Sequence, residues 1–82
     1  MSTTEARLGE LGITLPTPAA PAANYVPWVR TGNLVFVSGQ LPWADGRIAH
    51  TGRVGVELSL EDGVGAARLC GLALIAQVRA AC

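Results

Sequence analysis

The sequence predicts an α+β fold in which short β-hairpins pack on one long helix. Residues 25–48 hold short apolar and β-branched runs separated by pairs of turn residues, which is the pattern of hairpins. Residues 60–81 instead carry apolar residues at helical spacing. No strand pattern follows this helix, so the expected sheet is only partly present.

The first residues predict a short helix and a connector. Residues 3–11 have Ser2 or Thr3 as the candidate N-cap and Gly12 as the stop signal. Residues 15–23 contain three prolines and no periodicity, so they should be extended.

The first hairpin is expected from residues 25–37. Residues 25–31 form the first predicted strand, and Pro27 favours an edge position or a strand start because it lacks a backbone donor. Residues 34–37 are continuously apolar, which predicts a strand covered on both faces. Gly32 and Asn33 between them form a two-residue hairpin connection.

A second turn and a glycine-spaced loop follow. Asp45-Gly46 is a strong turn pair, and residues 47–50 should return as a short strand. Gly52 and Gly55 match no phosphate-binding loop, so turn geometry is their simplest explanation.

The long helix should begin at about residue 60. Ser59 and Asp62 have the form of a capping box. One face carries an apolar stripe, and Leu69 and Leu72 lie outside it. We therefore expect the helix to pack on the hairpins with one side and to expose a second apolar side. The stripe consists of Leu60, Val64, Ala67, Gly71, Leu74, Ile75 and Val78.

Composition excludes some classes of function. The 82 residues allow one small domain, and six basic and six acidic residues give no net charge. No basic patch supports nucleic-acid binding, whereas the absence of net charge favours self-association. No uninterrupted apolar run reaches the roughly 18 residues of a membrane span.

The two cysteines give no sign of a disulfide or a metal site. Cys70 and Cys82 are twelve positions apart on one predicted helix, about 18 Å of rise, so they cannot bridge. No ligand spacing indicates zinc, no motif indicates a cofactor, and no secretory signal is visible, so we expect a cytoplasmic protein.

Tyr25 and Ser38 are the leading site candidates. Both are polar within a strongly apolar hairpin, and a phenol and a hydroxyl on neighbouring strands can orient a small polar ligand or a water. The alternative is structural: a satisfied half-buried tyrosine, and a serine that ends a strand before Gly39.

Four other residues could have a functional role or a purely structural one. His50, near Arg47, could be a general base or an anion contact, or a solvated loop histidine. Cys70 is most simply a small buried hydrophobe. Trp28 and Trp43 could line a pocket or an oligomer surface, or pack in the core.

Several segments together resemble the RidA (YjgF) family. They are Leu11-Gly12-Ile13, Pro21-Ala22-Ala23-Asn24-Tyr25-Val26-Pro27, Val37-Ser38-Gly39-Gln40-Leu41-Pro42, Gly52-Arg53-Val54-Gly55 and Ala66-Ala67-Arg68-Leu69-Cys70. The most specific is Ser-Gly-Gln-x-Pro after an apolar strand. The likeness is to the longer branch of the family, with residues 1–14 as its N-terminal helix and turn and residues 15–82 as the first half of its domain.

The resemblance implies a chorismate-mutase-like α+β fold in a homotrimer with pockets between subunits. It also implies hydrolysis of reactive enamine or imine intermediates, such as 2-iminobutanoate or 2-iminopropanoate, to 2-keto acids and ammonia. Tyr25 matches the pocket tyrosine, Ser38 the pocket serine, and Gly39 follows in the same loop, so these three are the expected substrate-binding residues.

One departure bears on activity. Family members bind the substrate carboxylate with an arginine in the second half of the domain, and none of the six arginines here matches it. We therefore expect this chain alone to be impaired or inactive. A non-catalytic oligomerising or small-ligand-binding module is the main alternative, and a ribonuclease, as in the family's older name, has no support from the charge pattern.

Overall fold

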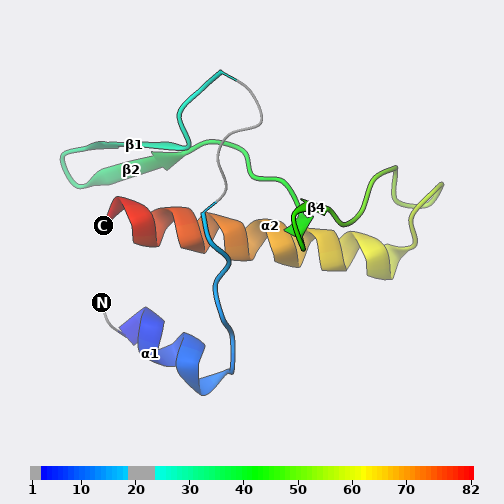
Figure 1. The fold of residues 1–82 in the computed structure, drawn as a ribbon, viewed down its shortest axis with the longest axis horizontal. Coiled ribbons are helices and arrows are strands. Elements are labelled where there is room, and N and C mark those ends of the chain that lie inside the picture. The colour runs from blue at the N-terminus through cyan, green and yellow to red at the C-terminus, as the bar shows by residue number, and fades with distance from the viewer. Residues whose placement is uncertain (1–2, 19–23) are drawn as a thin grey trace.

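The computed structural model describes residues 3–18 and 24–82. Two helices and two small antiparallel sheets make up this part of the chain. In chain order they are α1 (Thr3–Glu10), β1 (Trp28–Thr31), β2 (Leu34–Val37), β3 (Trp43–Ala44), β4 (Arg47–Ile48) and α2 (Leu60–Ala81). In Figure 1 the β1–β2 hairpin runs along one side of α2, and α1 lies on the other side. The predicted α+β class and its order of elements are confirmed.

Helix α1 ends where glycine allows it to end. Gly12 has a φ of 69° and its N–H donates to the Gly9 carbonyl, while the Ile13 N–H donates to the Leu8 carbonyl. These two bonds satisfy carbonyls of the last turn, as in a Schellman motif. The helix begins at Thr3, so Thr3 is not its N-cap, and the other candidate, Ser2, lies outside the described residues.

The first hairpin has the predicted turn but a shorter first strand. Trp28 pairs with Val37 and Thr31 with Leu34, which leaves Gly32 and Asn33 as the two-residue connection. Gly32 has a φ of 58°, a conformation that glycine adopts without steric cost. The strand starts at Trp28 and not at Tyr25, because Pro27 has no N–H to give the ladder. Tyr25 therefore precedes the strand.

The second hairpin is small and separate from the first. Trp43 pairs with Ile48 around Asp45 and Gly46, whose φ values of 53° and 81° suit the type I′ turn of a two-residue hairpin. The returning strand covers residues 47–48 and not 47–50. No ladder joins the two hairpins in the described part of the chain.

Helix α2 starts at a complete capping box. The Asp62 N–H donates to Ser59 Oγ at 3.1 Å, and the Ser59 N–H donates to Asp62 Oδ2 at 3.1 Å. Two donors that the helix cannot satisfy internally are thus paired, as the sequence predicts.

The glycine-spaced loop before α2 packs closely on its first turns. Gly52 and Gly55 have φ values of 124° and 89°, which confirms turn geometry as their role. Inside α2, a Cβ added at Gly63 would lie 2.7 Å from Val54 Cγ2, and one at Gly65 would lie 3.4 Å from His50 Nε2. Glycine at these helix positions lets the loop approach the helix.

The face of α2 that meets the hairpins differs from the predicted stripe. α2 packs against β1, β2 and β3, and its buried residues are Ala76, Gln77 and Ala81. Leu69 and Leu72, which lie outside the stripe, line a hollow of about 160 Å³ together with Trp43. An apolar side is exposed as expected, but it is the stripe itself, with Leu60 at 74% and Val64 at 63% exposure. Two of the three buried residues are alanines, whose small side chains let the helix approach its neighbours closely.

The molecule is more open than its length requires. Its radius of gyration is 14.0 Å, whereas a compact domain of this length has about 12 Å. Among the described apolar residues only Leu15, Ala76 and Ala81 are buried. Little of the apolar surface is therefore covered by these elements.

Helix α2 is also long and apolar enough to cross a membrane, with a mean hydropathy of 1.4 in its best 18-residue window. The absence of an uninterrupted apolar run does not exclude such a helix, because its most apolar window contains only two charged residues, Arg68 and Arg79, and keeps a high mean hydropathy. Core helices of soluble domains have the same length and composition, and α2 packs on both hairpins. The expectation that no membrane is involved stays a prediction.

Candidate functional site

Ser38 follows β2 directly, and its hydroxyl is bonded to the chain that precedes β1. Ser38 Oγ donates to the Pro27 carbonyl at 3.0 Å and lies 3.1 Å from the Val26 carbonyl. Its N–H donates to the Pro27 carbonyl as well, at 3.0 Å, which extends the β1–β2 pairing by one step. Since carbonyls occupy its proton, the Ser38 oxygen is left to accept a hydrogen bond from a ligand or a water.

An open hollow lies beside Ser38, over the base of the first hairpin. Its volume is about 220 Å³, and apolar side chains make up most of its wall. The described residues that line it are Val26, Trp28, Val29, Phe36, Val37 and Ser38. Apolar walls with one polar group are the usual composition of a small-molecule site.

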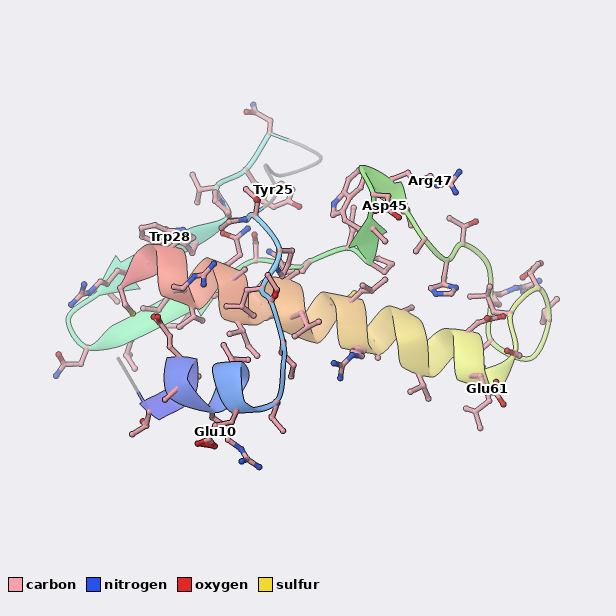
Figure 2. The ribbon with its side chains drawn as sticks, turned by 60° about the horizontal axis from the view of Figure 1, so that its bottom comes forward. Glu10, Tyr25, Trp28, Asp45, Arg47 and Glu61 are labelled. Carbon is pink, nitrogen blue, oxygen red and sulfur yellow. The ribbon has the colours of Figure 1, made fainter. Side chains whose placement is uncertain are left out.

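Tyr25 lies near this hollow in the chain but does not line it. It precedes Val26, the first lining residue, and it is 45% exposed. Figure 2 shows Tyr25 and Trp28 where the first hairpin begins, over the C-terminal half of α2 and far from Glu61. The structure thus bonds Ser38 to Val26, the residue that follows Tyr25. The role of Tyr25 and Ser38 as substrate-binding residues stays a prediction.

Gly39 has no structural reason to be glycine within the described residues. A Cβ added there would meet nothing within 4 Å, and its φ lies outside the left-handed region. The space above Gly39 is open. That is the setting in which a ligand or another chain segment could approach the backbone.

Sequence reasoning missed the residues that hold this loop. Gln40 Nε2 donates to the carbonyls of Ser38 at 3.0 Å and Gly39 at 3.3 Å, and Gln77 Nε2 lies 3.4 Å from Gln40 Oε1. Cys70 Sγ lies 3.5 Å from the Gln40 carbonyl, and Cys70 is half-buried. Cys70 is therefore a packed residue with one weak hydrogen bond, close to its simpler reading. The signal that could have found Gln77 is a glutamine that follows the apolar run of residues 69–76 in α2.

His50 is separated from this site. It packs at Gly65, whereas the Ser38 loop contacts the helix at Cys70 and Gln77, about 8 to 18 Å further along α2. The pKa of the Asp62 carboxyl lies below its ordinary 3.8, first because the Ser59 N–H and then because the Ser59 hydroxyl donates to the carboxylate, with a small contribution from His50. His50 thus does not join Ser38, and it is half-buried against α2, whereas the simpler reading expected a solvated loop histidine.

The two tryptophans line different hollows. Trp28 contributes to the hollow beside Ser38, and Trp43 faces Leu69 and Leu72 of α2 across a second one. The sequence left open whether the tryptophans line a pocket or pack in the core. Trp28 lines the hollow beside Ser38, and Trp43 packs against α2.

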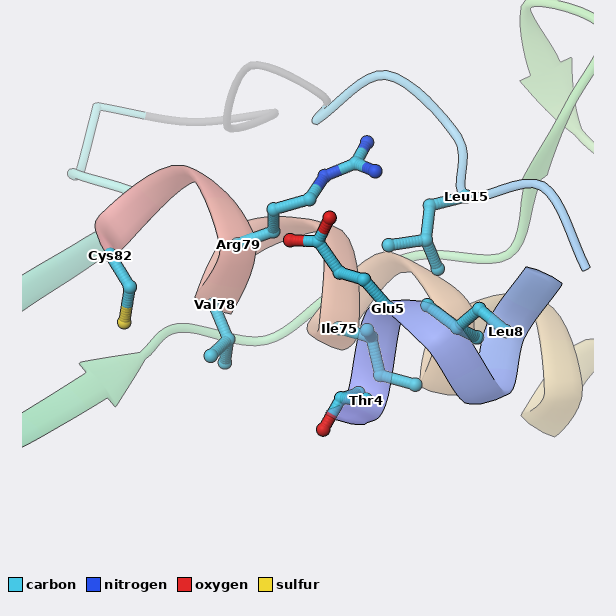
Figure 3. A pocket seen from close by; sticks show the side chains of 8 residues that line it. All are labelled: Thr4, Glu5, Leu8, Leu15, Ile75, Val78, Arg79 and Cys82. Carbon is cyan, nitrogen blue, oxygen red and sulfur yellow. The ribbon is translucent and has the colours of Figure 1, made fainter. Parts of the chain in front are cut away.

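A larger groove separates α1 from the last turns of α2. It has a volume of about 300 Å³ and is mostly apolar, with Glu5 and Arg79 as its charged lining residues. Figure 3 shows the side chains of both helices that line it. The lining residues are Thr4, Glu5, Leu8, Leu15, Ile75, Val78, Arg79 and Cys82. No group of three His, Cys, Asp or Glu side chains suited to a metal occurs in residues 3–18 and 24–82.

Comparison with known proteins identifies the family. Residues 5–82 match the model described as "YjgF/chorismate_mutase-like, putative endoribonuclease". Protein TCP17 of Trypanosoma cruzi is 47% identical over 76 residues, which are 93% of this chain and 48% of that protein.

Two solved structures are similar in fold and in sequence. One, described as a "putative endoribonuclease" from Shewanella oneidensis MR-1, matches with a TM-score of 0.87 and 37% identity over 95% of this chain and 52% of that one. The other, Atu1372 from Agrobacterium tumefaciens, described as of unknown function, matches with a TM-score of 0.76 and 51% identity over 94% of this chain and 46% of that one. The chain spans about half the length of these relatives.

Both the family model and the fold agree with the resemblance carried by Ser38-Gly39-Gln40. The chain belongs to the YjgF/chorismate mutase-like family.

Proposed function

We propose that this chain supplies one wall of a site that hydrolyses reactive enamines or imines of the 2-iminobutanoate and 2-iminopropanoate type. The family match over residues 5–82, with the Ser38-Gly39-Gln40 loop held beside an open apolar hollow, carries the proposal. The hollow suits a short aliphatic side chain. As in the resemblance, we further expect a homotrimer with pockets between subunits, no cofactor, and a cytoplasmic location.

The chemistry requires little beyond positioning. Water adds to the C=N carbon of the iminium. The C–N bond then breaks, which releases ammonia and forms the 2-keto acid. An oxygen that accepts a hydrogen bond from the attacking water or from the iminium N–H would orient it, and the Ser38 oxygen is free to accept. Tyr25, one residue before the hollow, would supply a second polar contact once the pocket is complete.

The carboxylate of such a substrate needs a cation that this wall lacks. No arginine is among the described residues that line the hollow beside Ser38. A guanidinium binds a carboxylate through two parallel hydrogen bonds, which other residues replace poorly. We therefore infer that activity needs an arginine from outside these 82 residues and is weak or absent in the chain alone.

The test compares the chain alone with a completed domain. A chimera would join this chain to the part of the Agrobacterium relative that it does not cover, since the two are 51% identical where they match. Release of 2-oxobutanoate from freshly generated 2-iminobutanoate should be faster with the chimera than with buffer, and Ser38→Ala or Tyr25→Phe should lower it. Turnover by the 82-residue chain alone would refute the need for an outside arginine. An inactive but folded chimera would refute the deaminase function.

A non-catalytic module remains the second candidate, and the exposed apolar stripe of α2 favours it. Leu60 and Val64 are 74% and 63% exposed, and such surface usually belongs to an interface. Sedimentation at several concentrations tests whether the chain forms a stable oligomer. A stable oligomer would favour the module if, in addition, the chimera binds 2-keto acids but does not turn over the imine. Cleavage of RNA, the activity in the descriptions of the Shewanella structure and of the family model, can be measured on the same samples, although the absence of net charge gives it no support.

A further inference from the structure

Gln77 is an unusual residue for its place in the fold. Its side chain is 1% exposed, and it is the largest fully buried side chain among the described residues. It lies on the face of α2 that meets the first hairpin, seven residues, and so about two turns, after Cys70. A buried amide of this size destabilises a fold unless hydrogen bonds satisfy it, so its contacts have to be specific.

The contacts of Gln77 lead to the candidate site. Its Nε2 lies 3.4 Å from Gln40 Oε1, and Gln40 Nε2 in turn donates to the Ser38 carbonyl at 3.0 Å and the Gly39 carbonyl at 3.3 Å. Cys70 Sγ, at 3.5 Å from the Gln40 carbonyl, ties the backbone of the same loop to α2. These contacts attach the loop to the helix both through side chains and through the Gln40 backbone.

The chemistry of the partners fixes the direction of these bonds. Two carbonyl oxygens can only accept, so both hydrogens of the Gln40 amide must point toward Ser38 and Gly39. Gln40 Oε1 then faces Gln77 and needs a donor there. If Gln40 turned over, its oxygen would meet the two carbonyls and the loop would lose both bonds.

We propose that Gln77 is the positioning residue of the Ser38–Gly39 loop. By donating to Gln40 it keeps the Gln40 amide turned toward the two carbonyls, and so it sets where the Ser38 oxygen and the open face of Gly39 meet a ligand. The identity of that ligand as a short 2-keto or 2-imino acid rests on the proposed function. The positioning itself does not.

The experiment uses NMR on the full 82-residue chain. Gln77→Met keeps the volume but removes the donor. It should move the Gln40 side-chain amide signals toward those of a free glutamine. Because the lost Gln77–Gln40 bond, of about 1 kcal/mol, holds the loop in place, the loop should open more often and hydrogen exchange at the Ser38 amide should rise about fivefold. Leu74→Met, at an exposed α2 position with 40% exposure, is the matched control and should change neither.

A second variant separates positioning from loss of stability. In Gln77→Glu the side chain donates only when protonated, so the Gln40 and Gly39 signals should change with pH, whereas in the wild-type chain and in Gln77→Met they should not. Because Cys70 Sγ contacts the same loop, the measurement is repeated in a Cys70→Ala background. If Gln77→Met fails to fold, this titration decides alone.

The outcomes are distinct. Changes confined to residues 38–40, together with the titration, establish the positioning role. Unchanged loop signals, no titration in Gln77→Glu, or equal acceleration of exchange at Ser38 and throughout α2 overturn it. Added 2-oxobutanoate tests the proposed function separately: if it fails to shift Ser38 and Gly39 in the wild-type chain while the loop results hold, the ligand is wrong and the positioning role stands.

Discussion

The Ser38 hydroxyl donates to the Pro27 carbonyl at 3.0 Å, across the end of the first hairpin. This bond, with the Ser38 N–H bond to the same carbonyl, holds the segment before β1 beside the loop after β2. It explains why Val26 and Pro27 stay beside Ser38 although both precede the strand.

Ser38→Ala should therefore affect folding as well as any ligand binding. Loss of the hydroxyl removes a bond to a backbone carbonyl, so we expect the free energy of unfolding to fall by about 0.5–1.5 kcal/mol. Urea denaturation followed by circular dichroism measures it. Ser38→Thr, which keeps the hydroxyl, is the control, and equal stability of Ser38→Ala and the wild-type chain would contradict the assignment.

Gly39→Ala should leave folding unchanged, because a Cβ at Gly39 meets nothing within 4 Å and its φ suits other residues. If Gly39 is a substrate-binding residue, the same change should still lower the activity of the chimera by narrowing the ligand's approach. Thermal unfolding and 2-oxobutanoate release are measured together. Full activity in the alanine variant would remove Gly39 from the site.

Two glycines of α2 should respond in opposite ways to alanine. Gly71→Ala meets open space and should stabilise the chain by about 0.5–1 kcal/mol through higher helix propensity. Gly63→Ala gains the same propensity, but its Cβ would lie 2.7 Å from Val54 Cγ2, and relieving such an overlap costs about 1–3 kcal/mol. Denaturation midpoints compare them. Equal stabilisation by both would mean that Val54 moves aside freely.

The capping box should weaken in acid. The folded-state pKa of Asp62 lies below its ordinary 3.8 because Ser59 donates to the carboxylate. The stability that this capping box contributes is therefore fully present above the ordinary pKa of 3.8. It is lost as the pH falls through the lower, folded-state pKa. Thermal unfolding between about pH 6 and pH 2 should show this loss, and Asp62→Asn should reduce it. An unchanged acid dependence in Asp62→Asn would show that other carboxylates cause it.

Local features of the fold could be predicted from short sequence patterns. Gly32-Asn33, Asp45-Gly46 and the Ser59–Asp62 box form the expected turns and cap, because each depends on φ preferences or hydrogen bonds between residues close in the chain. The first strand was predicted three residues too long, since the effect of Pro27 on the ladder outweighs the β propensity of Tyr25 and Val26.

The face of α2 that packs could not be predicted in this way. The apolar stripe through Leu60 and Val64 has the strongest helical periodicity, yet it is exposed, and Ala76, Gln77 and Ala81 are buried. Periodicity identifies a face that is able to pack, whereas the partner that is present decides which face does.

The sequence by itself determined the order of the elements, their turns and caps, and the family, since these depend on neighbouring residues and on the Ser38-Gly39-Gln40 motif. Only the tertiary structure showed that Gln77 contacts Gln40, 37 positions away, and that Gln40 in turn bonds the Ser38 carbonyl. The reason is physical: a hydrogen bond between distant residues needs the helix and the hairpin to be packed together before its donor and acceptor can meet.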